Sequence, residues 1–202
     1  MSEDRDSYRH WRASYKKPHD WDASYRRGQW DYLSEIGEVP HYAIAVGYIH
    51  KLLRAGDVLD AGCGEAVLGD YLDLSRFRYT GIDLSETAIA RAEIRLRCGT
   101  VLVSSIESFV PPAGVRYAAV VFNESIQHTD TPLESIDRYR EFLTTDGLIV
   151  VSLYKTPDED GNGPRLARFL AAECAGGRYA LVDRSEAVSV SHRRVWEIFV
   201  LR

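Results

Sequence analysis

Short apolar runs alternate with stretches of helical apolar spacing from residue 40 to about residue 175. The runs lack a polar position at every second residue, which is the pattern of parallel strands covered by helices on both faces. They lie at residues 57–61, 78–83, 100–103, 117–123 and 148–153. The alternation predicts a doubly wound, Rossmann-like α/β sheet in a three-layer α/β/α arrangement.

The stretches between these runs carry apolar residues at helical spacing. A helix that begins at Pro40 is expected to end before Gly56, because proline suits a first helical turn and glycine the position after the end. Further helices are expected at residues 65–74, 86–98, 132–143 and 165–174. Ser85 and Thr131 are the expected N-caps of the second and third of these, and the glycine pair at 176–177 would close the last.

The end of the chain departs from simple alternation. Two β-like runs, at residues 179–190 and 195–201, are joined only by the polar link at 191–194. A link that short permits a hairpin but not a right-handed parallel crossover. We therefore expect a seven-stranded sheet that ends in an antiparallel hairpin.

The first 39 residues have a different composition from the rest. They hold three of the four tryptophans, and a near-repeat, Trp11-Arg-Ala-Ser-Tyr15 and Trp21-Asp-Ala-Ser-Tyr25, recurs after ten residues. With few aliphatic side chains, this segment cannot build a core of its own. We divide the chain into residues 1–39, an aromatic-rich helical segment, and the main domain at 40–202. The segment is either a structural cover on the main domain or a lid over a ligand pocket.

Composition narrows the class of protein. The chain has 202 residues, a net charge of −5 and no apolar run long enough to span a membrane, and. Its first residues are charged and no apolar signal core follows them, so we expect a cytoplasmic protein. Basic residues concentrate before residue 30, where a solvated helix face is favoured over nucleic-acid contact.

The three cysteines, Cys63, Cys98 and Cys174, are widely separated. Their spacing matches neither a disulfide framework nor a zinc site. We interpret them as reduced small hydrophobic residues and expect no metal.

The stretch VLDAGCGEAVL, residues 58–68, predicts a strand, a glycine turn and a following helix. Gly62 and Gly64 would let a ligand approach the backbone closely, and the helix would direct its amides at the same place. A dinucleotide fingerprint would have a third glycine where Val67 stands, and no Lys-Ser or Lys-Thr pair completes a phosphate-binding loop. Asp60 at the strand end instead suits a ligand with positive charge.

Asp60-x-Gly62-x-Gly64, an acid at the end of the second strand, Asp83, and the terminal hairpin together resemble the class I S-adenosylmethionine-dependent methyltransferases, from about residue 40 to the end. The resemblance implies S-adenosylmethionine as cofactor. The glycine turn, with Cys63, would face its amino-acid part, and Asp60 would hold its amino group. Asp83, with Leu84 beside it, would accept hydrogen bonds from the ribose hydroxyls, which a carboxylate can do with both oxygens. Both acids also have structural alternatives as caps of a turn or helix.

The resemblance is incomplete at two places. Many relatives carry a further glycine where this chain has Ala66. Many also carry an acid for the adenine amino group at the position of Ser105, so that Ser105 or the Ile106 backbone would have to serve instead.

The segment NESIQH, residues 123–128, is similar to the fourth motif of the nodulation-type N-methyltransferases among small bacterial methyltransferases, with Gln127 and His128 in place of two tyrosines. In such sheets the ligand crevice lies at the carboxyl ends of the strands. The resemblance therefore places Asn123 at the cofactor and makes Glu124 and His128 the catalytic candidates, with Gln127 on the substrate side. His128 would act as a base, orient the substrate or merely cap a loop.

Five further residues are assigned to the site alongside this resemblance. His41 and Tyr42 stand where relatives often have an Arg-Tyr pair near the cofactor carboxylate. Trp30 and Tyr25 would close over the cofactor, with Tyr25 reaching the substrate as well. Tyr154, just past the fifth strand, would line the substrate side.

The function that this implies is methyl transfer from S-adenosylmethionine to an N or O nucleophile of a small molecule in bacterial secondary metabolism. The motifs of nucleic-acid methyltransferases do not occur in the sequence, so no nucleic acid is expected as partner. No membrane is expected as partner either, because the apolar runs are short. One alternative is an enzyme of the same fold that cyclises its substrate without methylation. A second is a non-catalytic module that binds S-adenosylmethionine or a protein partner. The sequence leaves open whether the chain forms a homodimer.

Overall fold

The computed structural model of the protein describes residues 18–155 and 161–202. The first copy of the near-repeat, the basic residues before residue 18 and part of the loop after Tyr154 lie outside these described residues. Within them, no helix combines the length and the apolar character needed to cross a bilayer.

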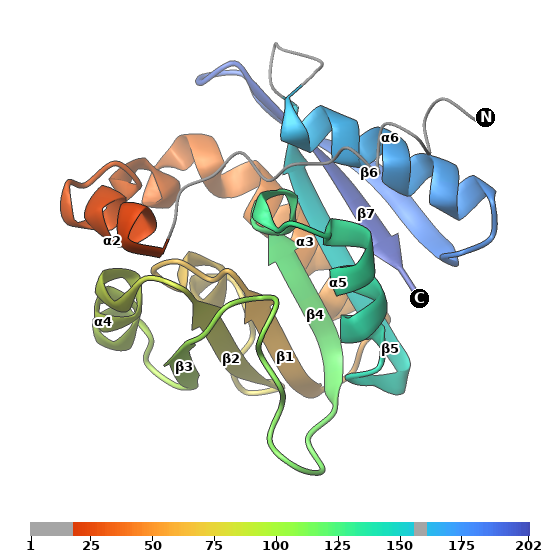
Figure 1. Cartoon of the computed structure of the whole chain (residues 1–202), viewed down its shortest axis with the longest axis horizontal. Coiled ribbons are helices and arrows are strands. Elements are labelled where there is room, and N and C mark those ends of the chain that lie inside the picture. Colours follow the sequence, from red (N-terminus) through yellow and green to blue (C-terminus); the bar gives the residue numbers. More distant parts are fainter. Residues whose placement is uncertain (1–17, 156–160) are drawn as a thin grey trace.

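Seven strands form one mixed sheet, in the order β3-β2-β1-β4-β5-β7-β6 (Figure 1). Strands β1 to β5 are parallel, and β7 runs antiparallel to both of its neighbours. The strands are β1 (Gly56–Ala61), β2 (Phe77–Asp83), β3 (Thr100–Val103), β4 (Tyr117–Asn123), β5 (Leu143–Tyr154), β6 (Leu181–Ser189) and β7 (Arg194–Leu201). The predicted doubly wound sheet with a C-terminal antiparallel hairpin is confirmed.

Helices cover both faces of this sheet. The described α-helices are α2 (Pro18–Arg26), α3 (Val39–Leu52), α4 (Glu86–Arg95), α5 (Pro132–Arg140) and α6 (Asn162–Ala175). Side chains of α5 and α6 pack with one set of strand residues, and side chains of α3 and α4 pack with another. In β4, for example, Val120 and Phe122 belong to the first core and Ala119 and Val121 to the second. The two cores give the three layers that the uniformly apolar strands predicted.

The helix predicted at residues 65–74 was wrong. Only a short 3-10 turn, Val67–Asp70, forms there. Gly64 and Ala66 have positive φ angles of 53° and 58°, and a right-handed helix cannot run through residues in that conformation, and. The glycine turn is therefore not followed by an α-helix whose amino end points at a ligand.

Smaller differences concern helix ends and the cysteines. Gly56, with a φ of 144°, begins β1 and does not cap α3, because that helix already ends at Leu52. Ser85 caps α4 as predicted, since its Oγ accepts the N–H of Ala88 at 3.1 Å, whereas the Thr131 side chain makes no capping bond to α5.

The predicted small hydrophobic role does not fit Cys98, which is exposed at the end of a surface turn. Cys63 is buried and packs in the core shared with α3 and α4.

Residues 18–38, which we name the cover segment, comprise α2 and two 3-10 turns, Asp31–Ser34 and Ile36–Glu38. Helix α2 lies next to α4, at the end of the sheet where the parallel strands finish (Figure 1). Asp22 joins the two helices, because its Oδ1 accepts the Ser85 hydroxyl and the Thr87 N–H, each at 2.9 Å.

Candidate active site

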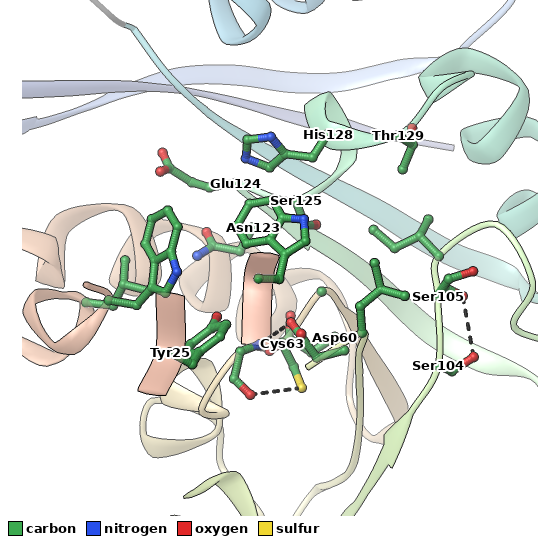
Figure 2. A pocket seen from close by; sticks show the side chains of 18 of the residues that line it. Tyr25, Asp60, Cys63, Ser104, Ser105, Asn123, Glu124, Ser125, His128 and Thr129 are labelled. Atoms are coloured by element: carbon green, nitrogen blue, oxygen red, sulfur yellow. Dashed lines mark hydrogen bonds between the residues drawn. The ribbon is translucent and has the colours of Figure 1, made fainter. Parts of the chain in front are cut away.

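A cavity of about 410 Å³ opens at the carboxyl ends of β1, β2 and β4, beneath the cover segment. Asp60, Cys63 and Tyr25 lie on one side of it, and Glu124 and His128 lie on the other (Figure 2). Its position is the crevice that the fold class predicts for a ligand.

The glycine turn forms the floor of this cavity. Gly62 and Gly64 have φ angles of 81° and 53°, which favour glycine, and. A Cβ atom on Gly62 would lie 2.4 Å from Cβ of Ser125, and one on Gly64 would lie 2.6 Å from the hydroxyl of Tyr25. The side chains of Ser125 and Tyr25 thus come close to this backbone, where the sequence led us to expect a ligand.

Asp60 is buried at the end of β1 and lines the cavity. Its Oδ2 accepts the Tyr79 hydroxyl at 2.7 Å, while its Oδ1 is buried with no hydrogen-bond partner among the described residues. Burial raises the pKa of this carboxyl to about 7; the hydrogen bond from Tyr79 opposes this shift, and the charge of Asp83 adds a smaller rise. An unsatisfied buried carboxylate oxygen is costly, and a ligand with a cationic N–H group would satisfy it.

Asp83 links the turn to the start of α4. Its Oδ2 accepts the N–H of Gly64 and its Oδ1 accepts the N–H of Ser85, both at 2.9 Å. Burial raises the pKa of Asp83, against the effect of these backbone hydrogen bonds. Each carboxylate oxygen has two lone pairs, so each keeps one acceptor position for a vicinal diol. The helix-capping alternative and ligand binding are therefore compatible in this residue.

Aromatic side chains of the cover segment form the roof. Trp21, Tyr25, Trp30 and Tyr32 all line the cavity. The rings of Trp21 and Trp30 stack at 5.6 Å between centroids, and Trp21 meets His128 edge-on at 5.0 Å. Residues of the proposed N-terminal unit thus contribute to the cavity, while the movement of a lid stays a prediction.

Glu124 and His128 stand opposite the glycine turn, after β4. Glu124 adopts a φ of 56°, which is rare outside glycine and is found where a functional site imposes a backbone conformation, and. Its Oε1 is buried without a hydrogen-bond partner in the described parts of the chain. Burial raises the pKa of Glu124 to about 7; His41 opposes this shift and Glu38 adds to it.

Four of the remaining cofactor candidates line the cavity: Tyr42, Leu84, Ser105 and Ile106. The Ser105 hydroxyl is already engaged, because it lies 2.8 Å from the Ser108 hydroxyl and accepts the Ser108 N–H at 3.0 Å.

Three predicted site residues do not line the cavity: His41, Gln127 and Tyr154. His41 is fully buried behind Asn123, so direct contact with a cofactor is not possible in this geometry. Gln127 is buried in the short turn after β4, and the ring of Tyr154 packs against Trp196. They are neighbours of cavity residues in the sequence, but the backbone turns their side chains away from it.

Sequence reasoning missed several lining residues, among them Trp21, Tyr32, Ser125 and the acids Glu107 and Asp130. A signal existed for Trp21, which precedes Tyr25 by four residues and so shares its face of a helix. Ser125 belongs to the segment 123–128 that the sequence places at the crevice, but its contact with Gly62 depends on the pairing of β1 with β4.

The charge of the lining is one-sided. Five carboxyl side chains contribute to it, and no lysine or arginine does so among the described residues. The acids are Asp60, Asp83, Glu107, Glu124 and Asp130. This field favours a cationic ligand and disfavours a phosphate.

Comparison with known proteins is consistent with this geometry. Residues 24–191 match a family model described as a methyltransferase domain. The ubiquinone biosynthesis O-methyltransferase of Nitrosospira multiformis is 29% identical over 130 residues, which cover 61% of this chain and 54% of the relative. The chain thus spans about half the length of the curated relative it matches.

Solved structures share the fold at low sequence identity. The plantazolicin methyltransferase BpumL aligns with a TM-score of 0.71 at 14% identity, over 100% of this chain and 99% of that one. The 1,6-didemethyltoxoflavin-N1-methyltransferase of Burkholderia thailandensis aligns with a TM-score of 0.66 at 20% identity, over 95% and 92%. The N-methyltransferase NodS of Bradyrhizobium japonicum aligns with a TM-score of 0.67 at 16% identity, over 86% and 90%.

Proposed function

The chain belongs to the class I S-adenosylmethionine-dependent methyltransferase family, and from that premise we propose that it methylates an N or O nucleophile of a small molecule in bacterial secondary metabolism. The observation that carries this proposal is the pairing of a glycine turn with two acids, one of which, Asp60, keeps a buried oxygen without a hydrogen-bond partner among the described residues.

The residues of the cavity fit S-adenosylmethionine. Oδ1 of Asp60, which has no partner in the described part of the chain, matches an ammonium group, and the remaining acceptor positions of Asp83 match two ribose hydroxyls. Leu84 and Ile106 offer an apolar surface for an adenine ring. The excess of carboxylates suits the net positive charge of a sulfonium next to an ammonium.

When bound, S-adenosylmethionine supplies an electrophilic methyl group: the acceptor's lone pair forms a bond to the methyl carbon, and the electron pair of the broken C–S bond stays on sulfur, giving S-adenosylhomocysteine. An acceptor that reacts through an O–H or N–H group must also give up its proton. Glu124 is suited to take it, because a carboxyl with a pKa of about 7 is partly ionised at neutral pH. His128 lines the same wall and is the second candidate.

The roof supports a small, flat acceptor. Trp21, Trp30 and Tyr32 present ring faces and edges to the cavity, which is closed above by the cover segment. Such walls bind compact aromatic or cationic groups well. Two of the structural relatives bear names of natural-product methyltransferases, and one is an N1-methyltransferase, which agrees with this choice of acceptor class.

The test has two parts. The first is calorimetric titration with S-adenosylhomocysteine of the wild type, Asp83→Ala and the control Asp146→Ala, which changes an exposed aspartate of β5. We expect the affinity to fall about tenfold or more, about 1.4 kcal/mol, in Asp83→Ala only. No binding by the folded wild type would contradict the proposal.

The second part is incubation with methyl-labelled S-adenosylmethionine and a panel of small amines, phenols and N-heterocycles. Methyl transfer adds the mass of one methyl group to an acceptor and releases S-adenosylhomocysteine. A product formed while S-adenosylmethionine stays intact would instead identify a cyclisation, and binding without any turnover would identify a non-catalytic module.

A further inference from the structure

A buried chain of polar side chains runs from the C-terminal hairpin to the wall of the cavity. A guanidinium N–H of Arg194, the first residue of β7, donates to Oε1 of Glu38. Oε2 of Glu38 lies 3.2 Å from Nε2 of His41, and Nδ1 of His41 lies 3.0 Å from Oδ1 of Asn123. Residues from three segments that are far apart in the sequence thus form one continuous series of contacts.

The middle of this chain is closed to solvent. Glu38 is 2% exposed and His41 is 0% exposed. The His41 ring is packed between Tyr42, at 4.1 Å, and Trp196, at 4.6 Å between ring centroids. Buried charges are kept only when they are paired and hydrogen-bonded, and the Arg194 and His41 contacts supply that pairing for the Glu38 carboxylate.

The contact with His41 determines how the Asn123 amide is oriented. Both ring nitrogens of His41 face oxygen atoms, and a carboxylate oxygen can only accept. Nδ1 of His41 faces Oδ1 of Asn123, and an amide oxygen can only accept, so the histidine is the donor in this contact. Once Oδ1 of Asn123 is taken up by His41, its NH₂ group is left for the cavity, which Asn123 lines.

Asn123 stands beside the glycine turn. Asp60 of β1 is paired with Val121 of β4. Gly62 and Asn123 each come two residues later, so they leave neighbouring strands at the same level. Ser125 confirms this closeness, because it fills the space beside Gly62. In the view of Figure 2, Asn123 lies between Glu124 and Tyr25 on the cavity wall. The glycine turn is the part of the site assigned to the amino-acid half of the cofactor.

We infer that Arg194, Glu38 and His41 are positioning residues that hold the Asn123 NH₂ group as a hydrogen-bond donor for the carboxylate of the bound cofactor. The inference rests on the cofactor of the proposed function. The described lining of the cavity contains no lysine or arginine, and the inference explains how it can still bind a carboxylate. The hydrogen-bond donor is the neutral amide of Asn123, and the positive charge of Arg194 lies behind it. His41 therefore acts through Asn123 and not by contact.

Two ligands separate this role from a general effect on the fold. S-adenosylhomocysteine carries the amino-acid carboxylate, whereas 5′-methylthioadenosine has the same adenosine and sulfur without it. Calorimetric dissociation constants of both are measured for the wild type, Asn123→Asp, His41→Phe and His41→Asn. Asp at position 123 still accepts from His41 but presents an oxygen to the cavity, and Asn at position 41 can still donate from near the position of Nδ1.

We expect Asn123→Asp to weaken S-adenosylhomocysteine by about tenfold or more, as for the loss of a hydrogen bond to a charged group. His41→Phe should weaken it by about three- to tenfold, and His41→Asn should restore most of the loss. The affinity for 5′-methylthioadenosine should stay within about twofold in all three, since the adenosine contacts are unchanged.

The surface end of the chain is tested with a matched pair. Arg194→Met removes the guanidinium next to Glu38, and the control Arg193→Met makes the same change at the exposed neighbouring position. Only Arg194→Met should raise the ratio of the two dissociation constants.

Equal weakening of both ligands by His41→Phe and Asn123→Asp would overturn the inference, because it would show a general effect on the cavity. Unchanged binding of S-adenosylhomocysteine would overturn it as well. A wild type that binds neither ligand would remove the cofactor and the inference together. Normal binding without methyl transfer to any acceptor would contradict the proposed function alone, and the ratio would still decide this inference.

Discussion

The N–H of Gly64 donates to Oδ2 of Asp83 at 2.9 Å, so the turn after β1 and the acid that ends β2 form one unit. The backbone amide that follows β1 thus holds the carboxylate at the end of β2 in place. The carboxylate keeps its orientation toward the cavity without a ligand, which lowers the ordering cost of binding. The loop geometry that replaces the expected helix is thus part of the site.

Gly64→Ala should destabilise the protein through both its φ of 53° and the contact of its new Cβ with the Tyr25 hydroxyl, 2.6 Å away. The backbone conformation alone costs about 1 kcal/mol or more in a residue other than glycine. Tyr25→Phe removes the hydroxyl, so Gly64→Ala should cost less in that background. Urea unfolding of the four proteins measures the coupling. Equal costs in both backgrounds would show that the Tyr25 contact is relieved elsewhere.

Asp60→Asn should make the ligand-free protein more stable at pH 8. The pKa of Asp60 is raised to about 7 by burial, from an ordinary value of 3.8, so the folded state holds a proton that the unfolded state has lost. Stability from this group is full below the ordinary pKa, falls as the pH rises toward 7 and is then constant. The substitution should flatten this fall and gain about 1 kcal/mol or more at pH 8. It should also weaken binding of S-adenosylhomocysteine.

Unfolding curves at pH 5, 6, 7 and 8 test this expectation, with Asp146→Asn as an exposed control. Glu124 has a similarly raised pKa and contributes to the same pH range. A wild type whose stability rises from pH 5 to pH 8, or an Asp60→Asn variant that loses stability at pH 8, would contradict it.

Glu124→Gln should abolish a rise of kcat that is centred near pH 7, because the base must be ionised to accept the acceptor's proton. The raised pKa of about 7 places that titration in an accessible range. His128→Gln is the comparison on the same wall, and it should keep the profile. If His128→Gln flattens the profile and Glu124→Gln leaves it intact, the two roles are reversed. The measurement is kcat against pH with saturating cofactor.

Asp22→Ala should loosen the cover segment. Asp22 is the acceptor for the Ser85 hydroxyl and the Thr87 N–H, and these bonds, with the nearby Arg26, lower its pKa. Without them, helix α2 loses its attachment to the first turn of α4. Amide hydrogen exchange should become faster in residues 18–26 while the sheet keeps its protection.

The matched control is Glu86→Ala, which removes an exposed acid from the first turn of α4 and leaves the hydrogen bonds of Asp22 to Ser85 and Thr87 in place. A cover segment that acts as a lid should also release S-adenosylhomocysteine faster in Asp22→Ala. Faster exchange with an unchanged release rate would identify it as a structural cover.

The sequence determined the sheet and the centre of the site. Uniformly apolar runs separated by helical periodicity fix a sheet with two covered faces, and the short link at residues 191–194 permits only a hairpin, and. Gly62, Gly64, Asp60 and Asp83 were predicted from their positions at or just past the ends of two strands and from the family resemblance that this local pattern carries. These features depend on neighbours in the chain, which a sequence displays.

Only the tertiary structure decided what surrounds that centre. The positive φ of Ala66 prevented the helix expected after the turn, although its apolar spacing favours one. Tyr32 reaches the cavity, and His41 stands behind Asn123, through contacts between segments that are remote in the sequence. Spacing states which residues share a face of one element. Which elements meet, and which side chain of a pair is in front, depends on packing over the whole fold.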